Sequence, residues 1–118
     1  MITSRRAGRW IIPKGWPIKG LEPFDAAARE AYEEAGIRGV VSEKAFGTYL
    51  YKKRDRDRDR RVSFEVTVFP LRVKRQRRKW PERHERKTRW VSLQKAVSLV
   101  AEKELRALIS DFRDHKRR

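Results

Sequence analysis

Cysteine is absent from this chain of 118 residues. Disulfides, thiolate nucleophiles and zinc–thiolate sites are therefore excluded. Histidine is scarce, and both His84 and His115 lie in charged segments, which is typical of solvated surface side chains. No apolar run approaches the roughly 18–20 residues that span a bilayer, and no secretory signal pattern opens the sequence. These absences favour a cytoplasmic protein that does not act at a membrane.

Charge, in contrast, is abundant. Charged residues make up 41% of the chain, hydrophobic residues make up 38%, and the formal net charge is +16. A chain of this length has room for one modest hydrophobic core, so we expect residues 1–118 to form a single domain. Acidic residues are concentrated in one place: between Leu21 and Ile37 there are five acids and one base.

Three of these acids, Glu30, Glu33 and Glu34, have the spacing i, i+3, i+4, so a helix would project them from one face. Close pairs of ionised carboxylates on such a face repel by roughly 0.2–0.5 kcal/mol each. A divalent cation would turn the repulsion into a binding site, because Mg²⁺ and Mn²⁺ prefer carboxylate oxygens. The plainer alternative is a solvated acidic helix face.

The residues around these acids resemble the Nudix box, the loop–helix–loop signature of the Nudix hydrolases. Gly15, Arg29, Glu30, Glu33, Glu34 and Gly36 stand at the spacing of that box. One position departs from it, because Leu21 stands where the box carries a glutamate. Glu22, the next residue, is our candidate to support the loop in its place.

The resemblance implies an activity and roles for these residues. Nudix hydrolases cleave phosphate–phosphate bonds by in-line attack of water, with Mg²⁺ or Mn²⁺ as cofactor. Glu33 and Glu34 would be the principal metal ligands, Glu30 a further ligand, and the carbonyl of Gly15 would also reach the metal. Arg29 would be structural, tying the loop to the helix. The candidates for the general base are Glu34, Glu65 and Glu85, and we leave the choice open.

The expected secondary structure agrees with this placement. We predict a short strand at residues 10–12, a helix at 26–35 capped by Asp25 and ended by Gly36, and strand-like runs at 40–53 and 61–74. The charged repeat at 54–60 reads as a hairpin loop. A further strand at 86–91 and helical segments at 92–100 and 102–113 complete an α/β order, consistent with the Nudix fold, an α/β/α sandwich around a mixed sheet. Residues 1–6 resemble the end of a first strand, whose beginning we expect to be missing; the sheet edge would then be covered by a partner subunit, as in a dimer, or left open.

Basic residues on either side of the box indicate the substrate class. Arg5, Arg6, Arg9, Arg86, Lys87 and Arg89 are our candidates to bind substrate phosphates, because an acidic metal centre ringed by bases suits a polyphosphorylated small molecule. The segments 4–16 and 86–91 resemble the diphosphoinositol polyphosphate and diadenosine polyphosphate hydrolase branch of the family. The alternative partner is RNA: the isoelectric point is about 11.1, and four Trp offer stacking surfaces, which would suit an RNA 5′-pyrophosphohydrolase or a non-catalytic RNA-binding module.

Overall fold

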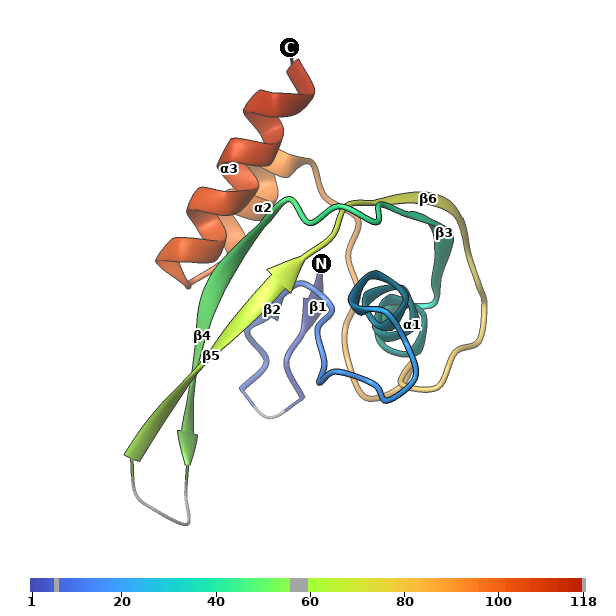
Figure 1. Ribbon diagram of the computed structural model, residues 1–118, viewed down its shortest axis with the longest axis horizontal. Helices are drawn as coiled ribbons and strands as arrows, with labels where there is room; N and C mark the ends of the chain where they lie inside the picture. Colours follow the sequence, from blue (N-terminus) through green and yellow to red (C-terminus); the bar gives the residue numbers. More distant parts are fainter. Residues whose placement is uncertain (6, 56–59, 118) are drawn as a thin grey trace.

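The computed structural model describes residues 1–5, 7–55 and 60–117, and Figure 1 shows their arrangement. The elements are β1 (Ile2–Thr3), β2 (Trp10–Ile11), α1 (Pro23–Ala35), β3 (Ile37–Val41), β4 (Gly47–Asp55), β5 (Arg60–Val68), β6 (Leu71–Gln76), α2 (Leu93–Leu99) and α3 (Lys103–Arg117). The expected α/β class is confirmed. Within these residues no helix is both long enough and apolar enough to cross a membrane.

The described strands pair as three antiparallel two-stranded sheets, β1–β2, β3–β6 and β4–β5. The sequence predicts one mixed sheet, whereas the described strands form separate antiparallel pairs. Each of the two long strand-like runs of the sequence forms two strands. Pro70 interrupts the second run. Its carbonyl accepts a bond from the N–H of Ser42, which stands at the break in the first run, at 2.8 Å. The chain turns at this level, so β3–β6 lies beside α1 and β4–β5 lies beside α3 (Figure 1).

Helix α1 begins earlier than the sequence predicted. The N-cap is Glu22 rather than Asp25, and the Glu22 side chain makes no capping hydrogen bond. Pro23 occupies the first helical turn, where its missing N–H costs nothing and its fixed φ suits the helix. The predicted end is confirmed: Gly36 has φ 70°, the left-handed conformation of a helix C-cap, and its N–H donates to the Tyr32 carbonyl at 2.8 Å.

The C-terminal helices cover the β4–β5 pair. Ser92 caps α2 as predicted, with its hydroxyl accepting from the Lys95 N–H at 3.1 Å. The apolar stripe predicted on α3 packs on the sheet, where Leu105 and Ile109 join Tyr49 of β4 in the larger core cluster. Gly47 allows this approach, because a Cβ there would stand 2.6 Å from a Leu108 methyl group.

The prediction of a strand at 86–91 is wrong. This segment forms one isolated bridge, between Thr88 and Ile2. Two backbone bonds accompany it, from the Thr3 N–H to the Lys87 carbonyl at 3.0 Å and from the Arg89 N–H to the Met1 carbonyl at 2.9 Å. The first residues of the chain are thereby held beside residues 87–89, and this brings Arg86 to α1.

Candidate active site

Glu34 is the most deeply buried charged residue of the core, with 2% of its surface exposed. It lies in the last turn of α1, where β1 and the segment before Lys87 close over the helix. Its Oε1 lies 3.2 Å from a terminal guanidinium nitrogen of Arg86. Its other oxygen, Oε2, is buried and has no hydrogen-bond partner among the described residues. A buried carboxylate oxygen without a hydrogen-bond partner is uncommon in a folded protein and calls for an explanation, of which a bound ion is one.

Glu30, one turn earlier, lies against both Glu34 and the loop before the helix. A Cβ at Gly15 would overlap the Glu30 carboxyl group, with its Oε1 only 2.6 Å away. Glycine at position 15 is therefore what allows the Glu30 carboxylate to lie on the loop backbone. The structure thus brings together three of the predicted metal-site residues, Gly15, Glu30 and Glu34.

Glu33 is turned differently. Its Oε1 accepts a hydrogen bond from Arg29 Nε at 3.3 Å, an i, i+4 pair on the helix surface. The sequence assigned Arg29 to the support of the loop, whereas its bond in the structure is to its own helix. Across residues 1–5, 7–55 and 60–117, no three acidic or histidine side chains are close enough together to form a complete metal site. The third predicted carboxylate, Glu33, is therefore not gathered with Glu30 and Glu34 among the described residues.

The electrostatics of Glu34 are unusual. Burial is the largest cause that raises its pKa to about 8; the positive charge of Arg86 opposes the rise, and the neighbouring Glu30 carboxyl group adds to it. The ion-pair distance to Arg86 is that of a charged pair, but burial and the second carboxylate outweigh it. A buried carboxyl group that resists ionisation beside a second carboxylate is a common property of functional sites.

Arg86 holds three separate segments together. Besides Glu34, its guanidinium donates to Glu82 Oε1 at 2.9 Å and to the Thr3 carbonyl at 3.1 Å. Only 9% of its side chain is exposed. The sequence assigned Arg86 to substrate phosphate, but its donors are engaged by protein groups and its contact is with the predicted metal ligand.

The other predicted phosphate-binding residues are more exposed. Arg5 pairs with Glu85 at 3.0 Å, and Arg9 lies 3.8 Å from a Glu102 oxygen. Lys87 and Arg89 are exposed, next to the segment that β1 contacts. Arg6 lies outside the described residues. The ion pairs found for Arg5 and Arg9 are with Glu82, Glu85 and Glu102 rather than with the carboxylates of α1.

The two further general-base candidates and the loop residues lie at the surface. Glu85 is tied to Arg5, and Glu65 is exposed on β5. Leu21 is 39% exposed, and Glu22 is exposed at the start of α1.

Sequence reasoning missed Glu82 and Thr3. Glu82 bonds Arg86 through its side chain, and its N–H donates to the Glu33 carbonyl at 2.9 Å. The spacing of Glu82 and Arg86, i and i+4, was the available signal for the ion pair. Nothing in the sequence indicated the contribution of Thr3, which is made by a main-chain carbonyl.

Comparison with known proteins agrees with the geometry. The family model described as "NUDIX domain" matches residues 2–112. Nudix hydrolase 21, chloroplastic, of Arabidopsis thaliana is 33% identical over 98% of this chain and 57% of its own length. Nudix hydrolase 13, mitochondrial, of the same plant is 27% identical over 95% of the chain and 57% of its own length. Diphosphoinositol polyphosphate phosphohydrolase 3-alpha of Mus musculus is 32% identical over 83% of the chain and 56% of its own length. The chain thus spans little more than half the length of these relatives.

Proposed function

The chain belongs to the Nudix hydrolase family, and we propose that it is a divalent-metal-dependent pyrophosphohydrolase that cleaves a phosphate–phosphate bond in a polyphosphorylated small molecule. One observation carries the proposal: the buried Glu34 oxygen that has no partner in the described part of the chain, beside Glu30 and the Gly15 backbone. These groups supply hard oxygen donors, and a divalent cation would favour the ionised form of Glu34 that burial disfavours.

The residues present fit Mg²⁺ or Mn²⁺. Glu34 Oε2 and the Glu30 carboxylate would hold the ion with the Gly15 carbonyl, and Glu33 would join them after leaving Arg29. When bound, such an ion neutralises phosphate charge and lowers the pKa of water. The protein contributes the positioning, because the ion pair with Arg86 holds one oxygen of Glu34, while the other has no partner among the described residues.

The substrate class follows from charge and from one relative. Hydrolysis of a phosphate–phosphate bond develops negative charge on oxygens that the protein has to stabilise. Arg5, Lys87 and Arg89 are exposed and lie near Arg86, since Arg5 pairs with Glu85 and the other two follow Arg86 in the chain. They would bind phosphates away from the cleaved bond. The mouse relative bears a name that specifies diphosphoinositol polyphosphates, so we include these compounds with dinucleoside polyphosphates and nucleoside triphosphates as the substrates to test.

The test is phosphate or pyrophosphate release from each of these compounds at a series of Mg²⁺ and Mn²⁺ concentrations. We expect hydrolysis that requires the metal and is abolished by chelation. Metal-dependent release from 5′-triphosphorylated RNA, with no hydrolysis of the small molecules, would replace the proposed substrate with RNA. Salt-sensitive RNA binding without any hydrolysis would overturn the proposal in favour of a binding module.

A further inference from the structure

A second charged surface lies on the two-stranded sheet β3–β6, which stands beside α1 on the side of the molecule away from α3 (Figure 1). Residues 71–79 contain six basic residues and no acid. All six are exposed, and none forms an ion pair within the described part of the chain. These residues are Arg72, Lys74, Arg75, Arg77, Arg78 and Lys79. In contrast, Arg5, Arg29 and Arg86 each contact a glutamate.

The register of β3–β6 gathers part of this charge on one face. Arg38 stands opposite Arg75, and Val40 stands opposite Arg72. Alternate side chains of a strand share a face, so residues 38 and 40 point the same way and their partners point with them. In a regular strand, residues 72 and 75 would point to opposite faces. The β-bulge between them, which leaves Lys74 without a partner in the register, brings Arg72 and Arg75 to the same face.

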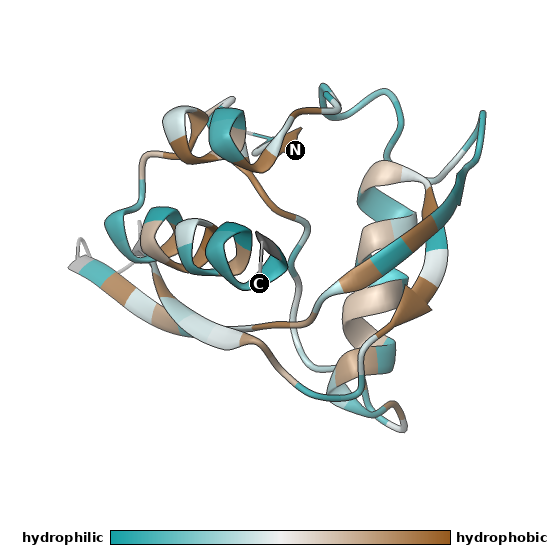
Figure 2. Cartoon of the chain, turned by 90° about the horizontal axis from the view of Figure 1, so that it is seen from above, coloured by the Kyte–Doolittle hydropathy of each residue, from teal (hydrophilic) through white to brown (hydrophobic). Residues whose placement is uncertain are grey.

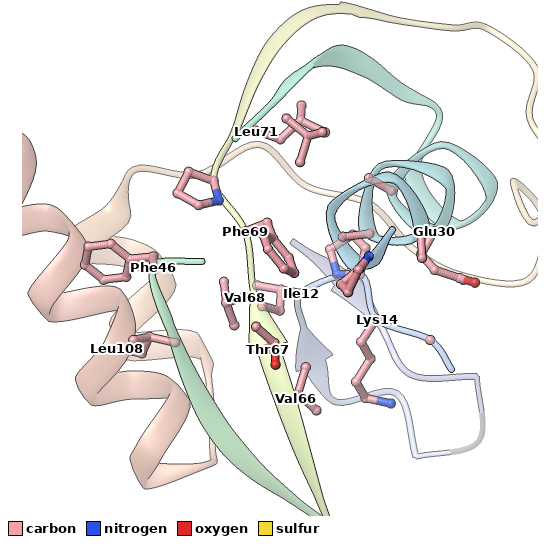
Figure 3. Close-up of a pocket in the computed structure, with 18 of the residues that line it drawn as sticks. Ile12, Lys14, Glu30, Phe46, Val66, Thr67, Val68, Phe69, Leu71 and Leu108 are labelled. Carbon is pink, nitrogen blue, oxygen red and sulfur yellow. The ribbon is translucent and has the colours of Figure 1, made fainter. Parts of the chain in front are cut away.

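This face, with Arg38, Arg72 and Arg75, is the outer face of the sheet. Leu71, the neighbour of Arg72, lines the pocket beside α1 (Figure 3), and Ile37 packs against the smaller core cluster. Because successive side chains alternate, Arg72 and Arg38 point away from these contacts. Figure 2 shows hydrophilic residues along much of β6 and in the segment that follows it.

The arrangement of these charges is unfavourable by itself. Arg38 and Arg75 are like charges directly opposite each other, and such a pair destabilises neighbouring strands. The Arg38 guanidinium lies 3.8 Å from the centre of the Tyr32 ring, so it is held against α1. A chain of anions lying along the outer face would relieve this repulsion and would release counterions from the anions.

An exposed tryptophan stands at the end of the same sheet. Gln76, the last residue of β6, donates to the Ala35 carbonyl at 3.1 Å and accepts from Trp90 Nε1 at 2.8 Å. The indole N–H is therefore satisfied and the ring is held in place, yet 64% of Trp90 is exposed. An aromatic ring that is fixed and open beside cations is a surface on which an unpaired base can stack.

We propose that the outer face of β3–β6, together with Trp90, binds single-stranded nucleic acid. Arg72 and Arg75 contact phosphates on the sheet, Arg77 contacts a phosphate at its end, and Trp90 stacks on a base. An acidic polypeptide would match the charges but has no base for the ring. A duplex offers phosphates, but its bases are already stacked on one another. This surface is separate from the carboxylates of α1 and its binding does not require hydrolysis.

The test uses an oligoadenosine RNA of about twelve nucleotides with a 5′-hydroxyl end, in the presence of EDTA. This RNA has no pyrophosphate group to cleave, and without metal the carboxylate site cannot bind its phosphates through an ion. We expect saturable binding by fluorescence anisotropy of a labelled RNA. The logarithm of the association constant should fall with the logarithm of the salt concentration with a slope of about −2, for three phosphate contacts.

Two double variants test the face of the sheet. Arg72→Gln with Arg75→Gln should lower affinity about tenfold or more and make the salt slope less steep by about 1.4. The matched control, Lys95→Gln with Lys103→Gln, removes the same charge from exposed positions on α2 and α3 and should change affinity less than about twofold. Thermal unfolding checks the fold, and loss of the Arg75 charge should leave the unfolding temperature unchanged or higher. Equal losses of affinity in the two double variants would overturn the proposal.

Trp90 is tested by its own substitutions. Trp90→Ala should lower affinity about tenfold without changing the salt slope, because stacking releases no counterions. Trp90→Phe keeps an aromatic ring but cannot bond Gln76, so recovery of most of the affinity would separate stacking from a structural role. Trp16→Ala is the control, since Trp16 is 68% exposed on the loop after Gly15 and should not contribute. A loss in Trp16→Ala but not in Trp90→Ala would overturn the proposal.

Other polyanions complete the experiment. Unlabelled single-stranded RNA should quench the fluorescence of Trp90, measured as the difference between wild type and Trp90→Phe, whereas duplex RNA of the same length should not. Equal quenching by the duplex would rule out stacking on an unpaired base. Oligoglutamate that binds as tightly as the RNA, with no dependence on Trp90, would identify an acidic protein as the partner and overturn the proposal.

Discussion

Arg86 and Glu34 form a buried ion pair at 3.2 Å, in which one oxygen of the carboxylate is held and the other has no partner within residues 1–5, 7–55 and 60–117. Replacing Arg86 with Ala would leave Glu34 without its counter-charge, and breaking a buried pair on one side costs about 3–5 kcal/mol. We expect Arg86→Ala to lower the free energy of unfolding by this order, measured by urea denaturation. Arg5→Ala is the control, because Arg5 is exposed and its pair with Glu85 contributes about 1 kcal/mol or less. A small loss for Arg86→Ala would show that the pair does not hold the site together.

The carboxylates themselves are tested by Glu34→Gln and Glu33→Gln. An amide is a poorer metal ligand than a carboxylate, so we expect each variant to lower kcat by about 10³-fold or more and to weaken metal binding. Steady-state kinetics with a metal titration measures both quantities. Glu104→Gln on α3, exposed and distant in sequence, is the control and should hydrolyse at the wild-type rate. Wild-type rates in both Glu33→Gln and Glu34→Gln would rule out the proposed metal site.

The role of Gly15 can be tested by a substitution that adds a single methyl group. Gly15→Ala would place a Cβ inside the Glu30 carboxyl group, so Glu30 has to move away from the loop. We expect a loss of metal affinity and of kcat of about tenfold or more, since small displacements of positioned groups are costly. Gly20→Ala is the control, because a Cβ there meets no atom within 4 Å, although its φ of 86° adds local strain. Similar losses in both variants would point to general loop strain instead of the Glu30 contact.

We expect the exposed bases to bind the substrate phosphates that are distant from the cleaved bond. We expect Lys87→Ala and Arg89→Ala to raise KM more for a substrate with five phosphates than for one with three, with kcat changed less. Their contacts are open to solvent, so each should be worth about 1 kcal/mol or less, several-fold in KM. Lys103→Ala on α3 is the comparison and should change neither. The same rise in KM for both substrates would mean that these bases do not distinguish phosphate number.

Leu21 is the one departure from the family's box. Its side chain is 39% exposed, so a carboxylate placed there by Leu21→Glu would remain solvated. We therefore expect kcat and stability to change little or to rise, as judged by kinetics and thermal unfolding. A loss of tenfold or more would show that the loop 13–22 depends on the leucine.

Local patterns predicted the elements of this chain better than its contacts. The C-cap at Gly36, the cap at Ser92 and the apolar stripe of α3 depend on residues close in sequence, and all are present. The start of α1 was placed three residues late because Asp25 is a good capping residue, whereas Pro23 decided the boundary. The two long runs were not divided because Pro70 alone does not show where the chain turns.

In the candidate site, too, local spacing was predicted better than contacts between distant residues. Glu30 and Glu34 came together as helical spacing predicts, and Gly15 could be assigned because the box relates it to them. The spacing of Glu33 placed it on the same face but could not show its bond to Arg29. The sequence predicts Arg86 as a phosphate ligand because it belongs to the basic residues that flank the box, whereas its burial depends on β1, which is more than eighty residues away.

That separation has a kinetic consequence. The bonds of Arg86 and Lys87 to Thr3 join residues 83 and 84 positions apart in the chain. Contacts of such separation form only after a long loop has closed, so they tend to form after local helices and hairpins. The environment of Glu34 should then be completed late in folding, after α1 itself. Substitutions at Arg86 would accordingly accelerate unfolding while leaving the refolding rate nearly unchanged, which places the assembly of the site on the native side of the folding barrier.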